Sequence, residues 1–270
     1  MKITTILLLF WSLLIFSGCQ KVNVDQSTKA VSTVKTPSGS EVTASSTTKV
    51  QPSATTVDPV LPQPVPVKPM PTQALVVDYP VPFVSQAPYG VWDAFHEETC
   101  EEASMIMAAA FFQKKTLSVH DMEQGLLDIV SWEERNGYNI DISASQVVEI
   151  LSQYFKQPAE IMADVSSDAI ISQLDQGNVL IVPAAGRRLG NPFYTPPGPL
   201  YHMLVIRGYD RSTYEFITND PGTKRGQAYR YSYDQLLSAV ADWDSQQVDG
   251  GINQSVIPAR QKKLVVVKNF

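Results

Sequence analysis

The stretch EETCEEASMIMAAAFF, residues 97–112, decides the fold of this chain and carries a cysteine near its start. Its apolar residues recur at helical spacing, and Thr99 with Glu102 matches the Thr-x-x-Glu capping box with which many helices begin. Cys100 then occupies the first helical position, where unpaired amide donors and the helix dipole favour a thiolate over a thiol. The stretch therefore predicts a core helix with a nucleophilic cysteine at its N-terminus.

The surroundings of Cys100 also carry charges that oppose this role. Four acidic residues crowd the same turn, namely Glu97, Glu98, Glu101 and Glu102. Because like charge raises a thiol pKa, the prediction requires these side chains to point to solvent and a cationic partner to approach the sulfur. The alternative is that Cys100 is a small buried hydrophobe at the start of a core helix, as many free cysteines are.

The overall composition limits the number of domains and the classes of partner. The chain has 270 residues, a net charge of −6 and a pI near 5.1. Lysine and arginine form no stripe interleaved with aromatic residues, as a surface for a phosphate backbone requires. We therefore expect no nucleic acid partner, and one globular domain once the N-terminal segments are set aside.

The N-terminus has the features of an export signal. Lys2 precedes the apolar run ILLLFWSLLIF at residues 6–16, which is too short for a comfortable transmembrane helix. The Ser-Gly-Cys sequence at residues 17–19 resembles the lipobox of bacterial lipoproteins, and this resemblance implies cleavage before Cys19 and its acylation with chains such as palmitate. The prediction is an extracytoplasmic lipoprotein anchored to the membrane of a bacterial cell envelope. A simple signal anchor or an ordinary cleavage site is the alternative.

A linker is predicted between the lipidated Cys19 and the globular domain. It consists largely of Ser, Thr, Val, Gln and Pro, which cannot bury enough apolar surface to offset the entropy of ordering, so we expect disorder. Alternating prolines within residues 52–71 favour extended polyproline II, at about 3.1 Å per residue. The predicted boundaries are 1–18 for the signal, 19–77 for the linker and 78–270 for the domain. With Cys19 lipidated, Cys100 is the leftover thiol of an exported protein, which favours a reactive role.

The globular part has a helical half followed by a strand-rich half. A strand is predicted at residues 81–84, and helices are predicted to begin at Cys100, Ser118, Ser143 and Ser167. Further strands are predicted at residues 179–182, 203–206, 214–218, 228–231 and 264–267, with one helix at residues 233–240. This order predicts an α+β domain rather than a βαβ series. The long Gly- and Pro-rich loop between Ala184 and Tyr201 is of a kind that is often functional.

Residues 202–220 are predicted to form a β-hairpin. With the turn centred on Arg211, Arg207 faces Glu215 and Val205 faces Ile217, and each such pair contributes roughly 0.2–1 kcal/mol. A slip of one residue loses these pairs, so this register is preferred.

The register places His202 directly opposite Asp220 at the open end of the hairpin, where a carboxylate can orient an imidazole and stabilise its charged form. A bulge would bring Asn219 to that place instead. A lone thiol at a helix N-terminus is the third group that a Cys-His-Asp mechanism requires.

The other two histidines are not part of the predicted catalytic group. His96 is expected to be a solvated loop residue, and His120 to lie in the first turn of a surface helix. The residues around Cys100 lack the paired spacing that zinc sites show, so we expect no metal and no cofactor.

In their order and context, these residues resemble the C-thirty-nine-like cysteine peptidases, relatives of the bacteriocin-processing, double-glycine peptidases in the papain-like clan. The resemblance covers residue 79 to the C-terminus and is carried by VPFVSQ ending at Gln86, Trp92, Cys100, His202 with the MLVIRGYD that follows, and Asp220-Pro221. It implies a papain-like fold, with a nucleophile helix in a helical half packed on an antiparallel β half.

The resemblance also implies roles for four residues. Cys100 attacks the scissile carbonyl of a peptide or protein substrate, His202 acts as general base and acid, Asp220 orients His202, and Gln86 helps to form the oxyanion hole. The two residues after the nucleophile, commonly Gly-Pro in the family, are both glutamates here. Two alternatives on the same fold stay open, a catalytically silent binding module and a wall-peptide amidase or acyltransferase.

Overall fold

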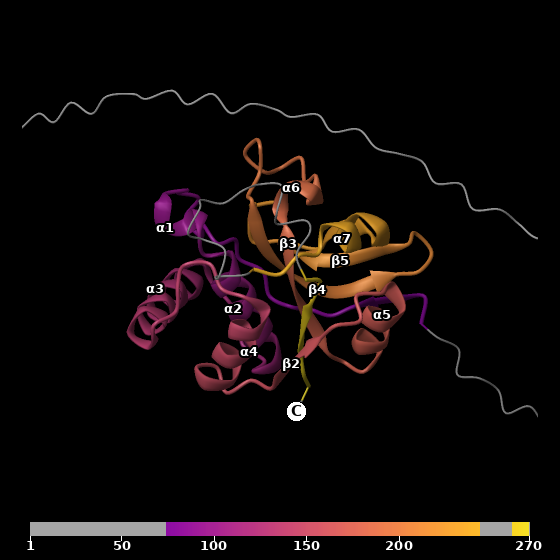
Figure 1. The fold of residues 1–270 in the computed structure, drawn as a ribbon, viewed down its shortest axis with the longest axis horizontal. Coiled ribbons are helices and arrows are strands. Elements are labelled where there is room, and N and C mark those ends of the chain that lie inside the picture. Colours follow the sequence, from indigo (N-terminus) through magenta and orange to yellow (C-terminus); the bar gives the residue numbers. More distant parts are fainter. Residues whose placement is uncertain (1–73, 244–260, 270) are drawn as a thin grey trace, which may run out of the picture. The chain divides into compact units, whose positions relative to one another are not determined.

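The computed structural model describes residues 74–243 and 261–269 (Figure 1). The helices are α1 (Ala94–Glu97), α2 (Cys100–Phe112), α3 (Val119–Asn136), α4 (Ala144–Gln153), α5 (Ser167–Asp175), α6 (Gly186–Leu189) and α7 (Tyr233–Ala239). The strands are β1 (Val76–Asp78), β2 (Ala159–Met162), β3 (Val179–Ala185), β4 (Tyr201–Asp210), β5 (Glu215–Asn219), β6 (Tyr229–Ser232) and β7 (Leu264–Val267). The predicted signal, the predicted lipidation site at Cys19 and nearly all of the predicted linker lie outside the described residues.

The described strands form one antiparallel sheet in the order β2-β7-β3-β4-β5-β6, with β1 beside β4. β4 is its central strand, because β3 pairs with residues 201–206 of β4 and β1 pairs with residues 208–210. Every residue of β4 is buried, so both faces of this strand are covered by packed side chains.

The two faces of the sheet carry different helices (Figure 1). Side chains alternate along β4, so Met203 and Val205 join the core that contains residues of α2, α3 and α4. Leu204 and Ile206 point the other way, into a second core with residues of α5 and α7. This is the predicted α+β, papain-like fold, in which a helical half packs against an antiparallel sheet.

The predicted nucleophile helix is α2, and its residues 100–110 are all buried. The predicted capping box is wrong, since Thr99 makes no side-chain cap and its hydroxyl instead donates to the carbonyl oxygen of His96 at 3.4 Å. Glu102 points into the protein, where its carboxyl meets that of Glu133 from α3. The capping pattern failed because this end of α2 is enclosed by protein rather than exposed to water.

Three other predicted helix starts are close to the observed ones. Ser118 and Ser143 both cap their helices through capping boxes, with Asp121 and Gln146 as the partners. The helix predicted from Ser167 is capped by Ser166, one residue earlier.

The strand predicted at residues 81–84 is wrong, and the chain instead enters the sheet earlier, through β1. Pro80 and Pro82 have no amide hydrogen and cannot donate to a ladder. The backbone of this segment is held by side chains, because Asn219 Nδ2 donates to the carbonyl oxygens of Val81 at 3.0 Å and Pro82 at 3.2 Å.

The hairpin exists, but its predicted register is wrong. The observed pairs include Asp210 with Glu215 and Val205 with Asn219, and a bulge interrupts the ladder between Ile206 and Gly208. The turn is wider than predicted because Asp210 Oδ1 accepts hydrogen bonds from the backbone and hydroxyl of Ser212, at 3.0 and 2.6 Å.

The predicted cross-strand ion pair is absent as a result. Arg207 binds Asp78 at 2.8 Å, while Glu215 binds Arg230 at 3.1 Å.

No helix among the described residues has the length and apolar character needed to cross a membrane.

Candidate active site

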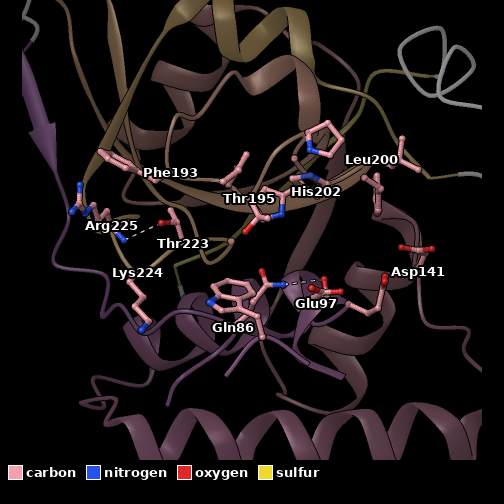
Figure 2. A pocket seen from close by; sticks show the side chains of 18 of the residues that line it. Gln86, Glu97, Asp141, Phe193, Thr195, Leu200, His202, Thr223, Lys224 and Arg225 are labelled. Carbon is pink, nitrogen blue, oxygen red and sulfur yellow. Dashed lines mark hydrogen bonds between the residues drawn. The ribbon is translucent and has the colours of Figure 1, made fainter. Parts of the chain in front are cut away.

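A cavity of about 700 Å³ opens between the helical half and the sheet (Figure 2). Its lining includes His202 from β4, Gln86 from the N-terminal segment, and residues 193–195 and 197–200 from the predicted functional loop. A volume of this size suits a small ligand or a few residues of a peptide.

Cys100 begins α2 beside β4 but does not line this cavity. Its side chain is 5 % exposed, and the sulfur accepts a hydrogen bond from the backbone nitrogen of Met203 at 3.3 Å. The thiol donates to Glu101 Oε2 at 2.9 Å. The structure thus brings Cys100 against the residue that follows His202, but no hydrogen bond among the described residues joins the sulfur to the imidazole.

Electrostatics keep the thiol neutral in this arrangement. Burial, followed by the charge of the Glu101 carboxyl and the hydrogen bond to it, raises the pKa of Cys100 well above its ordinary value. The hydrogen bond from Met203 opposes this shift but does not reverse it. The expectation that the neighbouring glutamates point to solvent is wrong for Glu101 and Glu102, which are 1 % and 2 % exposed.

His202 and Asp220 are in direct contact, with 2.8 Å between Nε2 and Oδ1. Both side chains are buried. Burial raises the pKa of Asp220, but attraction to His202 and hydrogen bonds from its neighbours outweigh it and lower that pKa below its ordinary value. Asp220 is therefore an ionised carboxylate that fixes the orientation of the ring. Because this contact uses Nε2, Nδ1 is the ring nitrogen that is not bound to Asp220.

The contact forms although the predicted register is wrong, because four further groups hold the Asp220 carboxylate. Oδ2 accepts hydrogen bonds from the hydroxyls of Tyr194 and Tyr231, both at 2.6 Å, and from Asn191 Nδ2 at 3.0 Å. Oδ1 also accepts from the backbone nitrogen of Gly222 at 3.0 Å. A side chain at position 222 would disturb this contact, since a Cβ there would lie 2.8 Å from Cε1 of the His202 ring.

Asn219, the alternative partner predicted for His202, makes its hydrogen bonds to other residues. Besides its two bonds to the N-terminal segment, its Oδ1 accepts from Arg207 at 3.4 Å and from the backbone of Ala228 at 3.2 Å. The structure therefore selects Asp220 over Asn219 as the neighbour of the imidazole.

Gln86 lines the cavity and forms hydrogen bonds with two loops, one before α2 and one after Asp220. Its Nε2 donates to the carbonyl oxygens of His96 at 2.7 Å and Glu97 at 3.2 Å, just before α2. Its backbone nitrogen donates to the carbonyl oxygen of Pro221 at 3.0 Å, directly after Asp220. In this structure the amide thus positions the approach to α2.

Sequence reasoning missed a cluster of buried carboxyls behind the sulfur, formed by Glu101, Glu102 and Glu133. Each has one buried oxygen without a hydrogen-bond partner among the described residues. Burial is the largest cause of the raised pKa of all three, and it brings that of Glu133 to about 8. Glu102 lies within the run of buried positions of α2, and this placement was a signal that its side chain points into the protein.

The remaining histidines behave differently from each other. His96 is buried, so its assignment to a solvated loop is wrong, and its ring contacts Asp93 at 2.8 Å and Glu123 at 3.1 Å. His120 lies exposed in the first turn of α3, as predicted. Within residues 74–243 and 261–269, no group of three His, Cys, Asp or Glu side chains is arranged to hold a metal ion.

Comparisons with known proteins identify the family of this chain. The family model described as Peptidase_C39 like family matches residues 79–247. Among solved structures, a putative C39-like peptidase from Bacillus anthracis is 13 % identical, with a TM-score of 0.44 over 73 % of this chain and 98 % of that chain. The curated proteins contain no match. The family match spans more than half of the 270 residues, and the chain belongs to the Peptidase_C39 like family.

Proposed function

We propose that the protein is a cysteine peptidase that hydrolyses peptide bonds with Cys100 as nucleophile, His202 as general base and acid, and Asp220 as the residue that orients His202. The observation that carries the proposal is the buried contact of 2.8 Å between His202 Nε2 and Asp220 Oδ1. His202 lines the cavity, and the next residue of β4, Met203, donates a hydrogen bond to the sulfur of Cys100. The family membership supports peptide hydrolysis as the reaction class.

The proposed reaction passes through an acyl-enzyme. His202 Nδ1 takes the thiol proton, and the thiolate attacks the carbonyl carbon of the substrate. When the tetrahedral intermediate collapses, the C–N bond breaks and the imidazolium gives its proton to the leaving amine. His202 then takes a proton from water as the water oxygen attacks the thioester carbon, the C–S bond breaks to release the carboxylic acid, and the proton returns from His202 to the sulfur.

Two donors are proposed to stabilise the oxyanion, the backbone amide of Cys100 and the side-chain amide of Gln86. The first amides of a helix have no acceptor within the helix, so the Cys100 amide is suited to this task. Gln86 Nε2 binds two carbonyl oxygens in the structure and must release one of them to donate to a substrate. Each such donor contributes about 3–4 kcal/mol to transition-state stabilisation.

For attack, the sulfur must first turn away from Glu101 toward the cavity, because Cys100 is buried and does not line that cavity. The same observation favours a second candidate function, a binding module without catalysis. Hydrolysis of a fluorogenic peptide library by the protein and by Cys100→Ala separates the two. We expect the substitution to lower kcat/KM at least about 10⁴-fold, as loss of a nucleophile does. If both proteins are equally active or both inactive, the peptidase proposal is wrong.

The N-terminal proposal is independent of the catalytic one. We propose that Cys19 carries the lipid anchor and that the domain therefore works outside the cytoplasm, near a membrane. Metabolic labelling with a palmitate analogue tests this directly: incorporation into the expressed chain should be lost in Cys19→Ser, and labelling that persists in this variant rules out Cys19 as the acylated residue.

Release of fragments from peptidoglycan, compared with cleavage of proteins, distinguishes a wall-peptide amidase from a general peptidase.

A further inference from the structure

The cavity carries opposite charges at its two ends (Figure 2). The acidic end is formed by Glu97, Glu98 and Asp141, and the basic end by Lys224 and Arg225. In Figure 2, His202 and Gln86 lie between the two ends. Any extended ligand that passes His202 along the cavity therefore meets carboxylates in one direction and cations in the other.

The charges of the acidic end lack cationic partners within the described part of the chain. Arg207, Arg230, Lys263 and Lys268 all form ion pairs with acids elsewhere, and none pairs with an acid of the cavity. The acids repel one another: burial and the charge of Glu97 raise the pKa of Glu98, and burial with the charge of Glu98 raises that of Asp141 to about 6. A ligand cation would relieve this repulsion.

The basic end is built differently but is equally open to a ligand. Lys224 is exposed and makes no ion pair among the described residues, and the guanidinium of Arg225 stacks on the ring of Phe193 at 4.8 Å from its centroid. Phe193 and Trp92 both line the cavity and remain 41 % and 39 % exposed. Flat exposed aromatic surfaces of this kind pack well against the aliphatic stems of long side chains.

We propose that the cavity selects peptides with a cationic side chain, lysine or arginine, on one side of the scissile bond and an anionic group on the other. The cation binds Glu97, Glu98 and Asp141, and the anion binds Lys224 and Arg225. This specificity rests on the proposed peptidase function for its catalytic meaning, but the binding preference itself is measurable without catalysis.

Matched peptides test the proposal with the full chain. In each position of a fluorogenic library, lysine is compared with norleucine, which keeps the stem without the charge, and glutamate with glutamine. We expect kcat/KM to be about tenfold higher for the best lysine and glutamate peptide than for its norleucine and glutamine counterpart, and to fall toward equality in high salt. Equal values at all positions overturn the proposal while leaving the peptidase function intact.

Substitutions in the acidic end supply the second arm. Glu98→Gln with Asp141→Asn should remove most of the preference for lysine, and Glu98→Lys should turn it toward glutamate at the same position. Glu134→Gln is the matched control, because Glu134 is exposed on α3 and outside the cavity. A merely structural role for these acids would lower all rates together and would not reverse the preference.

Binding separates failure of this proposal from failure of the catalytic one. Fluorescence anisotropy of labelled peptides with Cys100→Ala measures affinity without turnover. A tenfold tighter Kd for the charged peptide supports the charge-selective cavity even if no peptide is hydrolysed by the unmodified protein. Equal Kd values for charged and uncharged peptides, or no binding of either, refute it.

Discussion

Glu101 controls the ionisation of the thiol that precedes it in the chain. The thiol donates to its carboxyl at 2.9 Å, and burial together with this carboxyl raises the pKa of Cys100. Because Glu101 is itself buried beside Glu102, its own pKa is also raised. The Glu101 carboxyl therefore opposes ionisation of the thiol, and the thiolate forms less readily than helix position alone predicts.

Replacement of Glu101 by glutamine should make Cys100 more reactive. The thiol then ionises without the Glu101 carboxyl to which it donates, so the midpoint of its alkylation by iodoacetamide shifts to lower pH, and alkylation at pH 7.5 accelerates several-fold. Peptide mass mapping follows the modification at Cys100, with Glu134→Gln as the control. Slower alkylation of Glu101→Gln would instead mean that Glu101 assists loss of the thiol proton.

Residue types and local positions at the site were predictable, while the directions of side chains were not. The spacing of apolar residues predicted the helix α2, whereas its start at Cys100 was predicted from a capping box that does not form, and the pairing of His202 with Asp220 was predicted for a partly wrong reason. Asp220 reaches the ring because Tyr194, Tyr231 and Asn191 hold its carboxylate, and no local pattern joins those three distant residues to it.

At the scale of elements, α3 supports α2 through carboxyls rather than through apolar contacts alone. Glu133 of α3 and Glu102 of α2 share a hydrogen bond, and one oxygen of each is buried without a partner. Burial raises the pKa of Glu133 from 4.5 to about 8, so the folded state retains a proton that the unfolded chain releases. Stability is therefore lost as the pH rises from about 4.5 to about 8.

Glu133→Gln should remove this pH dependence. Glutamine stays neutral, so the variant should gain about 1–3 kcal/mol over the native protein at pH 8.5 and differ little at about pH 3.5, where the native carboxyl is mostly protonated in both the folded and the unfolded state. Denaturant unfolding at the two pH values measures the difference. The adjacent Glu134→Gln, on the exposed side of α3, should show no such contrast. A uniform loss at both pH values would contradict the assignment of a protonated Glu133.

Elements with strong local signals were predicted well, and those that depend on partners were not. Side-chain caps set the starts of α3 and α4, and continuous apolar runs gave β3, β4 and β7. The turn after β4 is wider than predicted and a bulge interrupts the β4–β5 ladder, so the hairpin register is shifted and Arg207 binds Asp78 instead of Glu215. The strand β1 escaped prediction, since three residues are too few for a periodic signal.

At the scale of the whole molecule, the candidate site exists only where the two halves meet. Cys100 comes from the helical half, His202 and Asp220 come from the sheet, and Gln86 bridges the loops of both. The order of strands, with β7 from the end of the chain between β2 and β3, has no signature in local sequence. This long-range assembly is what gives the cavity both its imidazole and its opposite charges.

If His202 activates the sulfur of Cys100 across this junction, covalent trapping of the thiolate must depend on the imidazole. The full chain, Cys100→Ala and His202→Ala are incubated with a peptidyl vinyl sulfone, and intact mass with peptide mapping locates the adduct. We expect one adduct on Cys100 in the unsubstituted protein, none at this position in Cys100→Ala, and at least a hundredfold slower modification in His202→Ala. Modification of Cys100 at the same rate with and without the imidazole would contradict it.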